Sequence, residues 1–215
     1  FISLYADPGQ CLLKVKQVEY TPEHDHLDLV METEKRGLIE TLIRHRFAGE
    51  ADHSPLLVAI SVQEGCPVNC KFCSVPIQSK SRNLTEKEIL QQIAIALQEA
   101  KIQGINLNQG KLKLSITKGG DSLYNQEVSK ALSILRYLLP MDVKMSTVFP
   151  ETNLAVKIAY DMINLANDYF SGTFVFQISL NSTDQEYRET EMVRKKRIIL
   201  LNLAEIYLER FSTIS

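Results

Sequence analysis

Three cysteines spaced C-x3-C-x2-C constrain this chain more than any other feature of its sequence. They lie in the stretch Cys66–Cys73, directly after the apolar run 56–62, which is typical of a buried strand. Thiolates presented on short loops are the usual ligands of iron–sulfur clusters. Three thiolates leave one iron of a [4Fe–4S] cluster open to another ligand. We therefore predict that Cys66, Cys70 and Cys73 bind such a cluster.

The sequence also allows two other interpretations of these thiols, a zinc site and a disulfide. A structural zinc site needs a fourth, closing ligand, which would be Cys11 or a histidine such as His53. A disulfide would leave one of the three clustered thiols over and would need an oxidising compartment. The cluster is the interpretation that the spacing favours.

Composition limits the kind of protein further. With 215 residues, 45% of them hydrophobic, the chain can bury one substantial core. A net charge of −2 argues against a broad nucleic-acid-binding surface. No apolar run approaches the ~20 residues that span a bilayer, and no signal peptide is evident. We expect a soluble protein in the reducing cytoplasm. Because the chain begins at Phe1 rather than Met, we also expect it to be a fragment.

The first fifty residues read as a small β-rich extension. The segment 27–31 alternates apolar and polar residues, a turn follows at 34–37, and 38–43 resumes an apolar pattern, which together predict a β-hairpin. A polar loop from Ala48 to Pro55 marks the predicted boundary. We expect an N-terminal unit over 1–50 and a second unit over 51–215.

Strands and helices alternate from residue 56 onward. Strands are predicted at 56–62, 112–116, 143–148 and 173–180, and helices at 85–102, 126–138, 152–167 and 184–210. Thr85 and Glu88 form a capping box at the first helix start. This order predicts an α/β fold, a partial βα-barrel with parallel strands and a ligand site at their C-terminal ends. The open edge of such a sheet needs a partner or a missing segment.

Several motifs resemble the radical S-adenosylmethionine (radical SAM) superfamily and, within it, the RlmN/Cfr-type 23S rRNA adenine methyltransferases. The cysteine motif with an aromatic residue before its last cysteine carries the superfamily resemblance. The closer similarity rests on the segments 37–43, 60–73, 82–89, 145–148 and 178–181. The resemblance implies a [4Fe–4S] cluster whose electron cleaves S-adenosylmethionine to a 5′-deoxyadenosyl radical. It further implies methylation of an adenine in RNA and a reducing partner such as flavodoxin or ferredoxin.

The resemblance also implies roles for single residues. Glu40 would be the acid/base. The residues that would contact S-adenosylmethionine are Phe72, Gly120, Asp121, Ser146, Ser179, Leu180 and Asn181. The chain departs from the family where Asp121 stands for a glutamate, Asn181 for a histidine and Ala59 for a cysteine. The cysteine that the family methylates near its C-terminus has no counterpart before Ser215.

Two alternatives remain open. Ala59 and the absence of net positive charge favour a radical SAM enzyme that acts on a small molecule or a peptide. A metal-binding module without catalytic activity is the second alternative. The basic run 194–197 is open to phosphate binding or to a solvated helix face.

Overall fold

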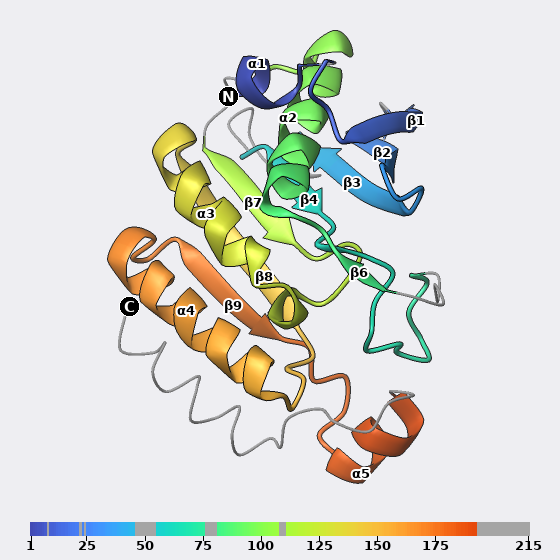
Figure 1. The fold of residues 1–215 in the computed structure, drawn as a ribbon, viewed down its shortest axis with the longest axis vertical. Helices are drawn as coiled ribbons and strands as arrows, with labels where there is room; N and C mark the ends of the chain where they lie inside the picture. The colour runs from blue at the N-terminus through green and yellow to red at the C-terminus, as the bar shows by residue number, and fades with distance from the viewer. Residues whose placement is uncertain are drawn as a thin grey trace.

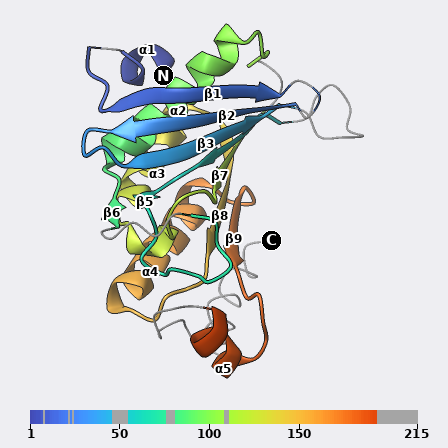
Figure 2. The same cartoon turned by 90° about the vertical axis from the view of Figure 1, so that its right-hand side faces the viewer.

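The fold is built around a seven-stranded mixed sheet with the strand order β1-β2-β3-β4-β7-β8-β9. The structure is a computed structural model that describes residues 1–7, 9–21, 23, 25–45, 55–75, 81–107 and 111–192. Figures 1 and 2 show α2, α3 and α4 against one face of this sheet. The predicted α/β class and the partial barrel of βα units are thereby confirmed.

Three antiparallel strands form one end of the sheet. They are β1 (Leu13–Thr21), β2 (His26–Thr33) and β3 (Leu38–Arg44). The predicted hairpin is confirmed as β2 and β3, which pair from His26↔Arg44 to Glu32↔Leu38. The sequence of Cys11–Val15 by itself predicts only a short strand. β1 is longer, and its pairing with β2 shifts between Val15 and Gln17. A register shift of this kind interrupts the alternation from which a strand is recognised.

Four parallel strands form the rest of the sheet. They are β4 (Leu57–Ile60), β7 (Leu112–Ile116), β8 (Met141–Thr147) and β9 (Phe174–Ile178). β3 pairs with β4 in antiparallel fashion, so the sheet continues across the loop predicted as a boundary. Residues 48–54 of that loop lie outside the described residues, and the division into two units stays a prediction.

The helices follow their local sequence signals. α2 (Glu86–Ile102) begins with the predicted capping box of Thr85 and Glu88, and α3 (Glu127–Leu138) ends two residues before Pro140. α4 (Asn153–Tyr169) begins after Thr152, whose hydroxyl accepts the Ala155 amide. A short helix α1 (Ile2–Tyr5) packs on α2. Among the described helices, none is long and apolar enough to cross a lipid bilayer.

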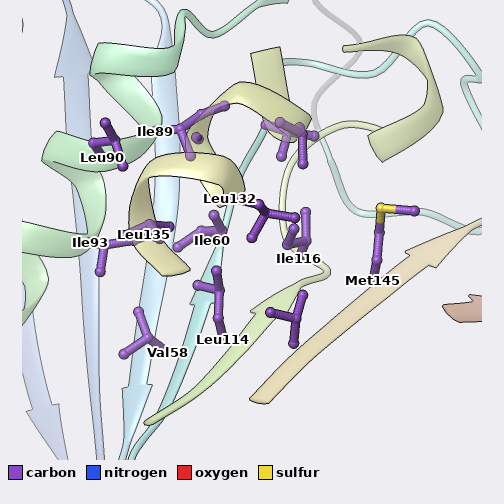
Figure 3. Packing of buried hydrophobic residues seen from close by; sticks show 14 of the residues in the cluster. Val58, Ile60, Ile89, Leu90, Ile93, Leu114, Ile116, Leu132, Leu135 and Met145 are labelled. Atoms are coloured by element: carbon purple, nitrogen blue, oxygen red, sulfur yellow. The ribbon is translucent and has the colours of Figure 1, made fainter. Parts of the chain in front are cut away.

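One continuous core lies between the sheet and these helices. Figure 3 shows Val58, Ile60, Leu114 and Ile116 of the central strands meeting side chains of α2 and α3. The same cluster includes Leu29 and Ile43 of the hairpin. Alternate residues of each strand point to the other face of the sheet, which the described helices leave uncovered.

The segment after β9 differs from the predicted long helix over 184–210. Asp184 caps a first turn, α5 (Gln185–Tyr187), and a wider π-type turn η3 follows at Arg188–Met192. The described part of this segment is therefore not one regular α-helix. Residues 193–215, with the basic run 194–197, lie outside the described residues.

Candidate functional site

The cysteine loop follows β4 and a short strand β5 (Gln63–Glu64), and returns through β6 (Arg82–Asn83). Cys66 and Cys70 are half-buried, and Cys73 is exposed. Cys66 and Cys70 pack against a small apolar cluster of Val68 and Met192, against which Tyr124 and Val148 also pack. The loop therefore stands at the C-terminal ends of the parallel strands, as predicted.

Residues after β9 hold the middle of this loop. The Lys71 amide donates to the carbonyl of Met192 at 2.9 Å. The Lys71 ammonium donates to the carbonyl of Thr190 at 3.0 Å and lies 3.3 Å from the Glu191 carboxylate. A segment more than a hundred residues further along the chain is thus part of the site, and no sequence pattern indicated this contact.

The surroundings of the thiols favour their protonated form when no metal is bound. Burial raises the pKa of Cys66 to about 11, and the Asp121 carboxylate adds to this shift. Burial, together with the other two thiols and Asp121, raises the pKa of Cys70 to about 12. Metal coordination deprotonates a thiol outright, because the positive ion replaces the missing stabilisation of the thiolate. The three free thiols on one short loop are soft donors, and this donor set fits an iron–sulfur cluster.

A zinc site and a cluster differ in how closely they bring their ligands together. Within the described residues, no three side chains among His, Cys, Asp and Glu are grouped to hold a single metal ion. Cys11 instead lies beside α1, with its Sγ 3.7 Å from the carbonyl of Tyr5. His53 lies outside the described residues. A cluster spreads its ligands more widely than one tetrahedral ion does, because each thiolate binds a different iron.

The Gly119–Asp121 turn lies next to the loop, at the end of β7. Asp121 is 4% exposed, and both carboxylate oxygens accept the Thr147 hydroxyl, at 2.7 and 3.0 Å. The amides of Val148 and Leu123 also donate to this carboxylate, at 2.9 and 3.0 Å. Burial nevertheless raises the pKa of Asp121. The carboxylate is thus directed toward the end of β8, a contact that the sequence did not predict.

The ends of β8 and β9 form the far side of the site. Ser146 is half-buried on the uncovered face of the sheet, where it pairs with Gln177. The Ser179 amide donates to the carbonyl of Thr147 at 2.7 Å and so extends the pairing of the two strands. Leu180 is 39% exposed, and Asn181 adopts a left-handed backbone with φ of 55°. These predicted contact residues share one edge with the cysteine loop.

Two predicted residues are more exposed. Phe72 lies between the second and third cysteines with 60% of its surface accessible. The Glu40 side chain is 65% exposed, and its Oε2 lies 4.0 Å from the Lys118 ammonium. Lys118 directly precedes the Gly119–Asp121 turn and also approaches Asp28 at 3.8 Å. Sequence reasoning missed Lys118, although its position before the two glycines was visible.

Comparison with known proteins agrees with this geometry. Residues 60–209 match the family model of the Radical SAM superfamily, which is more than half of the chain. The protein therefore belongs to the radical SAM superfamily. A solved structure of a radical SAM methyltransferase from Sphaerobacter thermophilus has the same fold, with a TM-score of 0.50 and 17% identity. That alignment covers 82% of this chain and 60% of the other.

Curated relatives make the similarity more specific. The dual-specificity RNA methyltransferase RlmN of Xanthomonas oryzae pv. oryzae (strain PXO99A) is 27% identical over 179 residues, which cover 82% of this chain and 41% of the relative. A probable dual-specificity RNA methyltransferase RlmN of Aquifex aeolicus (strain VF5) is 28% identical over 184 residues, covering 85% and 48%. The predicted resemblance to this group is confirmed. The chain spans less than half the length of these relatives.

Proposed function

We propose that the protein binds a [4Fe–4S] cluster through Cys66, Cys70 and Cys73, and S-adenosylmethionine beside it. The observation that carries the proposal is the meeting of the cysteine loop with the Gly119–Asp121 turn and the ends of β8 and β9 at one sheet edge. Such an edge is where open α/β folds bind their ligands. When bound, the cluster supplies the electron that cleaves the sulfonium of S-adenosylmethionine.

The residues of the chain would then bind, orient and shield the reactants. The apolar cluster of Val68, Tyr124, Val148 and Met192 would keep water away from the buried side of the cysteines. The backbone of Gly120 and Asp121, together with Ser146, would contact the cofactor from one side. Phe72 and the segment 179–181, with Ser179, Leu180 and Asn181, would contact it from the others.

Methylation of an adenine in RNA is the reaction that the RlmN relatives support best. Glu40 is the proposed acid/base, because its exposed carboxylate stands on the uncovered face of the sheet beside Lys118. A donor such as flavodoxin or ferredoxin would supply the electron. A cytoplasmic setting suits thiols that must stay reduced. RNA would have to present an unpaired or extruded base to this edge.

One observation favours a second candidate, a radical SAM reaction on a small molecule or a peptide. Ala59 is buried in β4, opposite Leu42 and Ser115, at the position where the methyltransferases have a cysteine. The methyl side chain of alanine has neither an acidic proton nor a nucleophilic atom, so it cannot do the work of a thiol. Binding of RNA with a steep dependence on salt would count against this candidate, since phosphate contacts release counterions.

The central experiment is an assay for cofactor cleavage. The protein is reconstituted anaerobically with iron and sulfide, reduced with dithionite, and assayed for 5′-deoxyadenosine formed from S-adenosylmethionine. We expect product from the wild type and none from a Cys70→Ala variant. Cys11→Ala is the matched control, because Cys11 lies outside the loop, and it should keep both iron and activity. A wild type that is loaded with iron and forms no product contradicts the proposal.

The edge strand β9 leads to a proposal about assembly. Within the described sheet, β9 pairs only with β8, so its other side offers backbone groups for a further strand. We propose that another segment or a partner covers this edge. Light scattering on the complete gene product, together with amide exchange of 174–178, tests this. Fast exchange of those amides in a monomer would contradict the proposal.

A further inference from the structure

Gln63 joins three segments of the candidate site. It is 2% exposed and follows β4 directly before the cysteine loop. Its Oε1 accepts the Asp121 amide at 2.9 Å, and its Nε2 donates to Oδ1 of Asn83 at 2.6 Å. Asn83 lies on the strand by which the cysteine loop returns. One buried amide therefore connects both stems of the loop to the Gly119–Asp121 turn.

The turn is shaped to receive this side chain. Gly120 has a φ of 96°, and a Cβ atom there would lie 2.7 Å from the Cβ of Gln63. A side chain at this position is therefore excluded both by the backbone conformation and by Gln63. The close approach of Gln63 thus explains why position 120 is a glycine without reference to any bound ligand.

Asp121 continues the connection to β8. Its carboxylate accepts two backbone amides and the hydroxyl of Thr147, which is itself 2% exposed and belongs to the helix-facing side of β8. The Thr147 hydroxyl in turn accepts the Phe149 amide at 2.9 Å. Through these bonds the turn is fixed to the strand end that carries Ser146.

We propose that Gln63 and Asp121 are positioning residues, which hold the turn between the cysteine loop and the end of β8 so that its backbone, and not the Asp121 carboxylate, faces the cofactor. This inference rests on the proposed function, since it concerns the binding of S-adenosylmethionine. It assigns Asp121 an indirect role, because its carboxylate acts through Thr147.

A double-mutant cycle tests whether Asp121 and Thr147 act as one unit. Asp121→Asn and Thr147→Val are combined, and the affinity of the cluster-loaded, oxidised protein for S-adenosylmethionine is measured by equilibrium dialysis. We expect each single variant to weaken binding roughly ten-fold and the double variant to bind no worse than the weaker single variant, because residues that act as a unit are not additive. Effects that multiply, or a Thr147→Val variant with unchanged affinity, would overturn the proposal.

A second readout needs neither cluster nor cofactor. In Gln63→Met the Asp121 amide loses its buried acceptor, so its hydrogen exchange should accelerate by roughly ten-fold or more. Exchange is followed by mass spectrometry on peptides that span 117–125 and 143–149. Unchanged protection of both segments in Gln63→Met and in Thr147→Val would overturn the proposed connection.

Matched variants control for general loss of folding. Thr147→Ser keeps the hydroxyl and should restore affinity to within about three-fold of the wild type. Thr173→Val removes a comparable hydroxyl bond, to the carbonyl of Phe170 at 3.1 Å, at the opposite end of β9 and should leave affinity unchanged. A Thr173→Val variant that lost affinity as Thr147→Val does would overturn the proposal.

Failure of the proposed function looks different. A wild type that carries iron and does not bind S-adenosylmethionine overturns the proposed function and, with it, the cofactor part of this inference. A wild type that binds, with effects that multiply in the cycle, overturns the inference alone.

Discussion

The two short strands that flank the cysteine loop, β5 and β6, form its stem. Opposite charges are paired in the stem, whereas the thiols of the loop have groups of like charge as neighbours. In the stem, Arg82 lies between two buried carboxylates, with its Nε 2.9 Å from Glu64 and another nitrogen 2.9 Å from Glu88. The Thr33 hydroxyl donates to Glu64 as well and connects the hairpin to this network. In the loop, the charges that raise the pKa of Cys70 are Asp121 and the other thiols.

The difference shows which region is complete without a ligand. Buried charges are tolerated when they are paired, and the stem contains its own cation. The thiols of the loop have the Asp121 carboxylate and one another as neighbours, and the proposed cluster would supply the positive charge that stabilises them as thiolates. The stem is therefore a preformed support, whereas the charge of the thiols would depend on the proposed cluster.

The largest expected effect breaks the stem. Arg82→Met should leave Glu64 and Glu88 buried without their cation, which destabilises the fold by about 3 to 5 kcal/mol. Urea unfolding followed by circular dichroism measures this loss. Lys130→Met is the control, because its ion pair with Glu127 is exposed and should contribute less than about 1 kcal/mol. Equal losses of unfolding free energy in both variants would show that the stem network stabilises the fold no more than an exposed ion pair does.

A second change tests the packing of the stem against the hairpin. A Cβ on Gly37 would lie 2.2 Å from Cδ of Glu64, so Gly37→Ala should cost about 1 to 3 kcal/mol through overpacking. Gly9→Ala meets its nearest neighbouring atom at 3.5 Å and should change stability by less than about 1 kcal/mol. Thermal unfolding of the two variants side by side decides whether the hairpin turn and the stem are in rigid contact.

Acid should weaken the stem selectively. Burial alone would raise the pKa of Glu88, but hydrogen bonds from Arg82 and Thr85 outweigh it and hold the pKa below its ordinary value of 4.5. The stabilisation is therefore present above pH 4.5 and is lost as the pH falls through the lower pKa of the folded state. Unfolding free energy measured from pH 7 downward should fall less steeply in Glu88→Gln. Parallel curves for variant and wild type would contradict this assignment.

The smallest expected effect concerns the contact that holds the loop. Lys71→Met removes an exposed ion pair and one bond to the carbonyl of Thr190, so global stability should change by less than about 1 kcal/mol. Hydrogen exchange of the loop, residues 66–73, should nevertheless accelerate, because local opening needs less free energy than global unfolding. An unchanged exchange rate would show that the hydrogen bond from the Lys71 amide to Met192 is sufficient to hold the loop in place.

Local signals made much of the fold predictable. The capping box placed the start of α2, Pro140 marked the end of α3, and β7 was predicted with the bounds that the structure shows. These features depend on neighbours within a few residues. The length of β1 was missed, because its irregular pairing with β2 obscures the alternation of its side chains.

The sequence indicated candidate residues of the site, but not the contacts that connect them. The cysteine spacing and the glycine turn can be recognised from the sequence alone. The role of Asp121 depends on Thr147, 26 residues away, and that of Gln63 on the Asp121 amide, 58 residues away. Hydrogen bonds at such separation leave no periodic pattern, and only the assembled strand ends bring these partners together.

Hydrogen bonds of the Ser61 hydroxyl fix the position of Glu40 in the sheet. The Ser61 hydroxyl donates to the carbonyl of Glu40 at 2.7 Å and accepts the amides of Glu40 and of Gly119. Successive residues of a strand alternate between the two faces, so a slip of β3 by one position would direct Glu40 into the core beside α2. Inserting or deleting one residue within β3 should therefore turn the Glu40 carboxylate away from the uncovered face, whereas a change of two residues should keep it there.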